Sequence, residues 1–262
     1  MNRIEKKFTE LRRKNKKAFI AFITAGYPDL ATTAKLAKEF EKAGVDILEL
    51  GVPFSDPLAD GPVIQESSQE ALKKNVQLPQ IFKLVKNLRR SVEIPICLMT
   101  YYNPVFCFRE EKFAKVASQS GVDGIIIPDL PPEEAVSLRK LTDKYGLDLI
   151  NFLSPTTSKE RIKKISKLTK GFIYYVSLTG VTGARKSLAA DIRKNLSLIK
   201  KYTAKPVCVG FGISTASQVK EISRYSDGVI IGSAIVKRIK DNLGRKGLVD
   251  KVSAFVRSLE SV

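Results

Sequence analysis

The sequence predicts a (β/α)8 barrel, the TIM-barrel form of the α/β class, with an additional helix at its N-terminus. Two observations support this prediction. The chain has 262 residues, close to the roughly 250 of a typical eight-fold barrel. Short apolar segments also alternate with longer amphipathic segments along the whole sequence, which is the pattern of parallel β/α units. Because no linker or low-complexity segment interrupts this pattern, we expect residues 1–262 to form one domain.

The eight strands are predicted from continuous apolar runs, because strands of a parallel sheet are buried on both faces. One such run contains Ile125, Ile126 and Ile127. The predicted strands are Ala18–Ala25, Val45–Val52, Pro95–Tyr101, Gly124–Pro128, Leu147–Leu153, Phe172–Leu178, Val207–Phe211 and Gly228–Ile231. An open, doubly wound sheet would show a similar alternation and is the alternative. The number of units and the positions of the glycines favour the barrel.

The outer helices are predicted from apolar residues that recur along one stripe, such as Leu36 and Phe40, with Lys and Glu elsewhere. The string Ala43–Asp46 (AGVD) returns as Ser120–Asp123 (SGVD). In both places a helix is expected to end in glycine just before a strand begins.

The composition restricts the chemistry, because the chain contains no histidine. This excludes Ser-His-Asp and Cys-His catalysis, so proton transfer must fall to Asp, Glu, Lys, Tyr or Cys. The cysteines Cys97, Cys107 and Cys208 form no CxxC pair. We expect them to be reduced residues on apolar strands, and we expect no metal site.

The formal net charge of +18 could indicate a nucleic-acid partner. However, Lys and Arg are spread over most predicted helices and no nucleic-acid-binding motif is present, so we interpret the charge as a solvated outer face. No apolar run approaches the ~18 residues of a membrane span, and the basic N-terminal segment lacks the features of a signal peptide. We therefore expect a cytoplasmic protein that binds neither nucleic acid nor membrane.

Glu49 and Asp60 are the candidate catalytic residues. Glu49 lies near the C-terminal end of a predicted strand, where barrel enzymes place their active sites. A carboxylate among hydrocarbon must be paired, hydrogen-bonded or raised in pKa, and an ion pair with a lysine is the structural alternative. Asp60 lies in a long connection from Pro53 to about Val63. It could cap the helix that begins near Val63, or meet Glu49 in one cleft as an acid and a base.

Glycines follow each of the last three predicted strands, at Gly180–Gly183, Gly210–Ser214 and Gly232–Ser233, and a short helical stretch comes directly after Ser233. Barrels that bind phosphate do so with loops near strands seven and eight and with the N-terminus of a short helix. A single glycine would more often indicate a turn, but three clusters together predict a phosphate site. The third glycine of a GxGxxG fingerprint is missing, which argues against a dinucleotide.

These residues resemble the tryptophan synthase alpha chain family. The resemblance rests on Phe22–Pro28, Leu48–Pro62, Gly180–Gly183 and Gly210–Ser214, and it extends over the whole chain. It implies a lyase of L-tryptophan biosynthesis that cleaves indole-3-glycerol phosphate to indole and glyceraldehyde 3-phosphate. It also implies a beta chain as partner, in an alpha2-beta2 heterotetramer. Pyridoxal phosphate would belong to that beta chain, and this chain would carry no cofactor.

The resemblance also implies roles for individual residues. Glu49 would be the general acid and base at C3 of the indole ring, and Asp60 would bind the indole N–H. The implied substrate-binding residues are Phe22 and Tyr174 around the ring, Thr182 on a loop that closes over the substrate and meets Asp60, and Gly183, Gly212, Gly232 and Ser233 around the phosphate.

Three other functions are weighed against this one. Another phosphate-binding barrel of aromatic amino-acid or cofactor biosynthesis would lack the Leu48–Pro62 string. A catalytically weak alpha subunit that mainly activates the beta chain allosterically would differ only in its kinetics. A nucleic-acid binder would show salt-dependent binding. If a beta chain is the partner, we expect Phe54, Asp56 and Pro57 to be exposed to it while Asp60 lies on the other side of the same loop.

Overall fold

The computed structural model describes residues 2–176, 185–210 and 212–260, and its strands form one wholly parallel sheet in the order β5-β4-β3-β2-β1-β9-β8-β7-β6. The strands are β1 (Ala18–Thr24), β2 (Ile47–Gly51), β3 (Ile96–Met99), β4 (Gly124–Ile126), β5 (Asp148–Ile150), β6 (Phe152–Leu153), β7 (Ile173–Val176), β8 (Val207–Gly210) and β9 (Gly228–Ile231). If β5 and β6 are taken together as the one predicted strand Leu147–Leu153, the observed strands begin and end within two residues of their predicted limits. The predicted ends at Leu178 and Phe211 lie outside the described residues.

The sheet closes on itself through β5 and β6, which are the two halves of one predicted strand separated by Asn151. β5 pairs with β4, and β6 pairs with β7. The carbonyl of Asn151 accepts a hydrogen bond from the N–H of Tyr174 at 3.0 Å, so the pairing with β7 continues across the interruption. The predicted eight-stranded barrel is therefore confirmed, and the open-sheet alternative is wrong.

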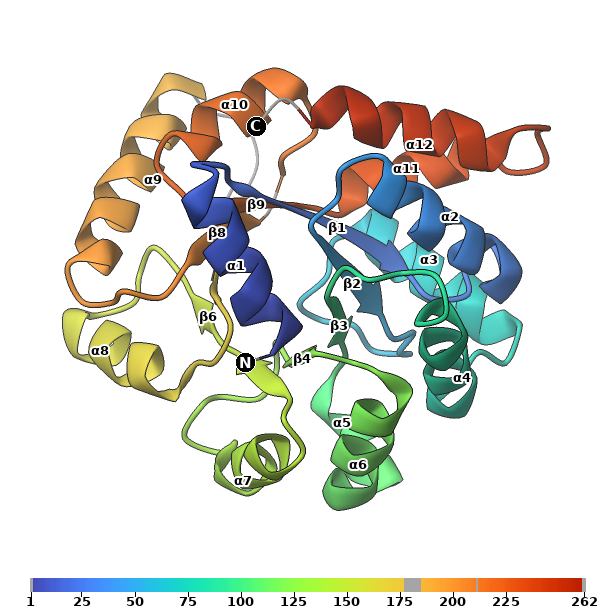
Figure 1. Cartoon of the computed structure of the whole chain (residues 1–262), viewed down its shortest axis with the longest axis horizontal. Helices are drawn as coiled ribbons and strands as arrows, with labels where there is room; N and C mark the ends of the chain where they lie inside the picture. The colour runs from blue at the N-terminus through green and yellow to red at the C-terminus, as the bar shows by residue number, and fades with distance from the viewer. Residues whose placement is uncertain (1, 177–184, 211, 261–262) are drawn as a thin grey trace.

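Helices surround the strands as an outer ring (Figure 1). Leu36 and Phe40 are fully buried, as the apolar stripe predicts. The ring helices are α2 (Leu30–Lys42), α3 (Pro62–Lys73), α4 (Leu78–Leu88), α5 (Tyr102–Phe108), α6 (Glu110–Ser120), α7 (Val136–Lys144), α8 (Lys159–Leu168), α9 (Arg185–Lys200), α10 (Ala216–Ser223), α11 (Ser233–Lys240) and α12 (Leu248–Leu259). Within the described ranges, no helix is long and apolar enough to cross a membrane.

The predicted N-terminal helix, α1 (Arg3–Arg13), lies across the barrel opening in Figure 1. Its buried residues Ile4, Phe8 and Leu11 pack in one cluster with inward-facing residues of the strands. The ring of Phe8 lies 5.8 Å from the ring of Phe172, which directly precedes β7. α1 therefore covers the end of the barrel at which the strands begin, so the interior of the barrel is accessible from the opposite end.

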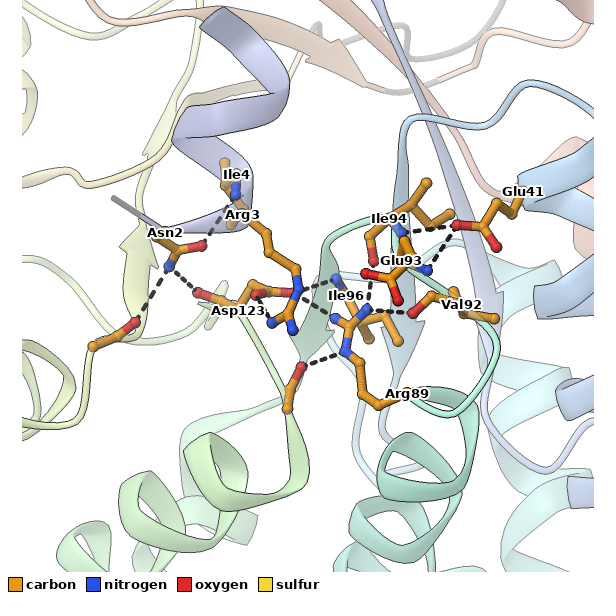
Figure 2. Close-up of polar contacts among 12 residues, drawn as sticks. Asn2, Arg3, Ile4, Glu41, Arg89, Val92, Glu93, Ile94, Ile96 and Asp123 are labelled. Atoms are coloured by element: carbon orange, nitrogen blue, oxygen red, sulfur yellow. Dashed lines mark hydrogen bonds and ion pairs between the residues drawn. The ribbon is translucent and has the colours of Figure 1, made fainter. Parts of the chain in front are cut away.

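Asp123 joins α1 to the barrel (Figure 2). Its carboxylate accepts a hydrogen bond from the N–H of Ile96 at 2.8 Å and forms ion pairs with Arg3 and Arg89. Asn2 donates a hydrogen bond to the carbonyl of Asp123 at 2.8 Å. Because Arg89 also donates to three backbone carbonyls, most N–H donors of its partly buried guanidinium group have a partner.

The repeated AGVD and SGVD strings have a common structural reason. In each, the aspartate precedes a strand and accepts a hydrogen bond from the first or second backbone N–H of a neighbouring strand, which satisfies that buried donor. A third aspartate does the same. The pairs are Asp46 with Phe19 at 3.0 Å, Asp123 with Ile96 at 2.8 Å and Asp227 with Val207 at 2.9 Å. These contacts align the strands at the end that α1 closes.

The prediction for the cysteines is correct for two of the three. Cys97 and Cys208 are buried on β3 and β8. Cys107 is instead exposed on α5, because the chain forms this helix (Tyr102–Phe108) shortly after β3 ends. Among the described residues, no group of three acidic or cysteine side chains could hold a metal ion.

Candidate active site

A cavity of about 720 Å³ opens at the carboxyl end of the strands, opposite α1. Its lining residues come from β1, β3, β6, β7 and β9, from Asn151 between β5 and β6, from the loops that follow β2, β4, β6, β8 and β9, and from the helices α3, α8 and α11. The predicted site residues that line this cavity are Phe22, Asp60, Tyr174, Gly212, Gly232 and Ser233. Residues far apart in the sequence are thus gathered in one site. Thr182 and Gly183, which were also predicted, lie outside the described residues.

Glu49 is buried on β2 between Phe22 of β1 and Cys97 of β3, with only 1% of its surface exposed. Neither carboxyl oxygen has a hydrogen-bond partner among the residues that the structure describes. Burial, and secondly the nearby charge of Asp60, raises the pKa of Glu49 to about 8. The structural alternative, an ion pair between Glu49 and a lysine, is not found among the described residues. Glu49 is therefore protonated at neutral pH and has a proton to donate.

Asp60 has a different environment. It is half-buried at the cavity wall, and one carboxylate oxygen accepts a hydrogen bond from the hydroxyl of Tyr101 at 3.0 Å. Burial raises the pKa of Asp60 to about 6, against the lowering effect of the Tyr101 hydrogen bond. Asp60 does not cap α3, whose N-cap is Gly61 without a side-chain cap bond. The capping alternative is therefore wrong.

The two carboxyl groups thus have separated pKa values within one site. At neutral pH, a pKa of about 8 leaves Glu49 largely protonated, and a pKa of about 6 leaves Asp60 largely ionised. Such a pair provides an acid and an anion without histidine. Glu49 does not itself line the cavity, whereas its β1 neighbour Phe22 and Asp60 do. Contact with a bound molecule therefore requires a small movement of Glu49 or Phe22, as is common before substrate binds.

Aromatic rings form one side of the cavity. Tyr174 of β7 lies against Phe152 of β6, with 4.8 Å between the ring centroids. A β-carbon at Gly210 would approach the Tyr174 ring to 2.6 Å, so only glycine at this position of β8 leaves room for the tyrosine. The wall therefore offers flat, largely apolar surface to a planar ring.

The far end of the cavity is suited to an anion. Gly212, Gly232 and Ser233 line it, and Ser233 is the first residue of α11. Gly232 is the N-cap and makes no side-chain cap bond, which leaves the N–H groups of the first turn of α11 available. Helix N-termini favour negative charge. The phosphate position stays a prediction, for which this helix start offers free N–H donors.

The loop between β2 and α3 differs from expectation on its outer side. Asp56 is exposed as predicted, but Phe54 is only half-exposed and Pro57 is buried. Leu58, which was not predicted, is instead the most exposed large apolar side chain, at 92%. Phe54 stacks on Tyr101, and this contact turns its ring inward.

Tyr101 is the other residue that sequence reasoning missed. It follows β3 at the carboxyl end of the barrel and is almost fully buried. Its position at the end of a predicted strand and its hydroxyl group could have indicated a role.

Comparison with known proteins identifies the family. The sequence profile described as "Tryptophan synthase alpha chain" matches residues 8–262. The chain belongs to the tryptophan synthase alpha chain family. It is 48% identical to the tryptophan synthase alpha chain of Thermoanaerobacter sp. (strain X514) over 262 residues, which is 100% of both chains. It is also 48% identical to that of Citrifermentans bemidjiense over 260 residues, covering 99% of this chain and 97% of the relative.

Solved structures give the same result for the fold. The crystal structure of tryptophan synthase subunit alpha from Legionella pneumophila str. Paris superposes with a TM-score of 0.93 at 36% identity, covering 99% of this chain and 97% of the other. The family inferred from the sequence strings is confirmed, as are the barrel fold and the role of an alpha subunit in tryptophan biosynthesis.

Proposed function

We propose that the chain catalyses the aldol-type cleavage of indole-3-glycerol phosphate to indole and glyceraldehyde 3-phosphate. Membership of the tryptophan synthase alpha chain family supports this reaction. The observation that carries the proposal is the buried Glu49, whose oxygens have no partner, close to the cavity wall that holds Asp60. An unpartnered buried carboxyl group is costly and is expected where chemistry requires it.

Glu49 is proposed to act as general acid and then as general base. The protonated carboxyl donates its proton to C3 of the indole ring, which leaves the positive charge on the ring nitrogen. The carboxylate so formed removes the proton from the hydroxyl group on the adjacent side-chain carbon. A carbonyl then forms, the bond between that carbon and C3 breaks, and its electrons return to the ring. Protons balance, because Glu49 ends as it began.

Asp60 is proposed to accept a hydrogen bond from the indole N–H and to stabilise the positive charge on the protonated ring. A fixed anion stabilises a developing charge most strongly where water is excluded. The pKa of about 6 supports an ionised Asp60 at neutral pH.

The remaining site residues are proposed to bind substrate. Phe22 and Tyr174 would contact the indole ring, and Gly212, Gly232 and Ser233 would hold the phosphate at the start of α11. Thr182 and Gly183 are proposed from the family resemblance alone, with Thr182 closing over the substrate and Gly183 near the phosphate. All proposed steps move protons and stabilise charge, so they require no cofactor on this chain.

The partner is proposed to be a tryptophan synthase beta chain, which carries pyridoxal phosphate, in an alpha2-beta2 heterotetramer in the cytoplasm. Two large apolar side chains support docking at the carboxyl end of the barrel: Leu58 before α3, 92% exposed, and Phe106 on α5, 65% exposed. A single exposed apolar side chain is ordinary on a protein surface. Leu58 and Phe106, however, follow the neighbouring strands β2 and β3, at the end of the barrel where the cavity opens.

The test is to incubate the purified chain with indole-3-glycerol phosphate, with and without a beta chain, and to measure indole. Release of indole by the chain alone supports the proposed enzyme. Indole release only with the beta chain present, or stimulation of the beta chain without any cleavage, would favour the regulatory alternative.

A further inference from the structure

We propose that Tyr101 is a positioning residue that fixes the orientation of the Asp60 carboxylate and keeps it ionised. This inference rests on the proposed function, in which Asp60 stabilises positive charge on the substrate. Tyr101 does not line the cavity, so it acts through Asp60 and not by touching the substrate.

The hydrogen-bond pattern assigns the proton of the tyrosine hydroxyl. The N–H of Ala59 donates to the Tyr101 hydroxyl oxygen at 2.9 Å. The same hydroxyl lies 3.0 Å from Oδ2 of Asp60. Because the backbone N–H of Ala59 can only donate, it uses a lone pair of the Tyr101 oxygen. The hydroxyl proton therefore points to Asp60 and forms the hydrogen bond to its carboxylate. The hydroxyl therefore favours the ionised carboxylate, and it holds two consecutive residues of the loop in fixed positions.

The ring of Tyr101 holds the other end of the same loop. It stacks on Phe54 with a centroid distance of 5.2 Å and an interplanar angle of 27°. Phe54 is in turn fixed by Ser68 of α3, whose hydroxyl accepts from the Phe54 N–H at 2.8 Å and donates to its carbonyl at 2.9 Å. Tyr101 thus contacts both the start and the end of the loop that carries Asp60, and it does so from the rigid end of β3.

Within the part of the chain that the structure describes, Tyr101 is the residue that donates a hydrogen bond to the Asp60 carboxylate. Among the described residues, no lysine or arginine forms an ion pair with Asp60. The titratable groups around it are Glu49 on β2 and Tyr174 on β7, with Asp129 beyond Tyr101. None of these is a cation. The Tyr101 hydroxyl is accordingly the group that offsets the cost of burying the Asp60 charge.

The test is Tyr101→Phe, which keeps the ring stacked on Phe54 and removes only the hydroxyl. A hydrogen bond to a charged group is worth enough to move a pKa by about one unit. Asp60 should then hold its proton to higher pH. We expect kcat for indole-3-glycerol phosphate cleavage to fall about twofold at pH 7 and roughly tenfold at pH 5, because the acidic limb of the kcat–pH profile moves up by about one pH unit from the Asp60 pKa of about 6. KM should change less than about threefold.

Two further variants separate this role from a structural one. Tyr102→Phe removes a neighbouring hydroxyl that donates to Glu110 at 3.0 Å, away from the cavity, and should leave the pH profile unchanged. In an Asp60→Asn background, Tyr101→Phe should cost little further activity, because the group it acts through is gone.

An unshifted acidic limb in Tyr101→Phe, or the same loss of activity with and without the Asp60 carboxylate, would overturn the positioning role. These outcomes are distinct from failure of the proposed function. That failure would appear as wild-type chain that releases no indole, or as a Glu49→Gln variant that releases it normally.

Discussion

Asp60 has a hydrogen-bond donor in the Tyr101 hydroxyl, whereas Glu49, buried close to the same cavity, has no partner for either oxygen. Burial raises both pKa values, and it does so more for the fully buried Glu49, whose pKa the Asp60 charge raises further, whereas the Tyr101 hydrogen bond lowers that of Asp60. The pKa of Asp60 is therefore about 6 and that of Glu49 about 8. One residue is thereby kept as an anion and the other as an acid.

Replacing Glu49 by glutamine keeps the size of the side chain and removes its ionisable proton. General acid–base groups contribute roughly 10²–10⁴ in rate, so turnover should fall by at least ~10². Affinity for glycerol 3-phosphate, measured by calorimetry, should stay within a few-fold because the phosphate end of the cavity is untouched. Turnover within tenfold of wild type would show that Glu49 is not the acid.

Replacing Asp60 by asparagine should also impair cleavage, because a neutral amide stabilises a positive ring less well than a carboxylate. Thermal stability should be unchanged or higher, since a half-buried charge is removed and α3 keeps its Gly61 N-cap. Indole release and melting temperature are the two measurements. A destabilised variant that still turns over normally would assign Asp60 a structural role.

The phosphate position can be tested with Ser233, the first residue of α11. A carboxylate at a helix N-terminus stabilises the helix but repels a phosphate. Ser233→Asp should therefore weaken glycerol 3-phosphate binding by tenfold or more while the melting temperature holds or rises, whereas the neutral Ser233→Asn should weaken it far less. Equal affinities for both variants would place the phosphate elsewhere.

Asp148 provides a test of stability at the closed end of the barrel. It is 4% exposed, its Oδ2 has no hydrogen-bond partner, and burial raises its pKa from 3.8 to about 7. Because the folded state holds the proton more tightly, the contribution of Asp148 to stability is lost as pH rises from about 4 through about 7.

Asp148→Asn should accordingly raise the melting temperature at pH 8, by about 2–4 °C for each kcal/mol gained, and the gain should shrink below pH 5. Asp143→Asn is the matched control, because Asp143 is exposed and pairs with Lys170 at 2.7 Å. If Asp148→Asn changed the melting temperature by the same amount at every pH, the destabilisation could not come from the charge of the Asp148 carboxylate.

The docking surface predicts coupling between partner and site. Leu58 lies two residues before Asp60, so a beta chain that contacts it would change the position of a catalytic group. Leu58→Ser should reduce activation by the beta chain more than it reduces basal cleavage. Leu243→Ser, at a 42% exposed leucine between α11 and α12, is the control that should leave activation intact. The two binding events should also be coupled equally. Glycerol 3-phosphate should increase the affinity of the chain for the beta chain by the same factor by which the beta chain increases its affinity for glycerol 3-phosphate.

Much of the fold could be predicted because it depends on local pattern. Apolar runs such as Val45–Val52 located the strands, and the position of Glu49 near a strand end located the site. The interruption of the fifth strand at Asn151 was not predicted. This interruption arises because β5 pairs with β4 while β6 pairs with β7, and the residues of the strand alone do not indicate which neighbours each half will have.

The site was predicted less completely, since contacts across a loop depend on its path in three dimensions. The bond from Tyr101 to Asp60 joins residues 41 positions apart. The stacking of Phe54 on Tyr101 also joins distant positions, and together with the burial of Pro57 it corrects the expected partner surface. Asp60 was equally compatible with a helix cap until the structure assigned the cap to Gly61.

The central claim is that ionised Asp60 and protonated Glu49 act together, and the pH dependence of kcat for indole release tests it most directly. Activity should rise with pH as Asp60 ionises near 6 and fall as Glu49 loses its proton near 8, giving a bell-shaped profile. Asp60→Asn should remove the acidic limb and keep the basic one. A profile that is flat between pH 5 and 9, or one that Asp60→Asn leaves unchanged in shape, would contradict the account.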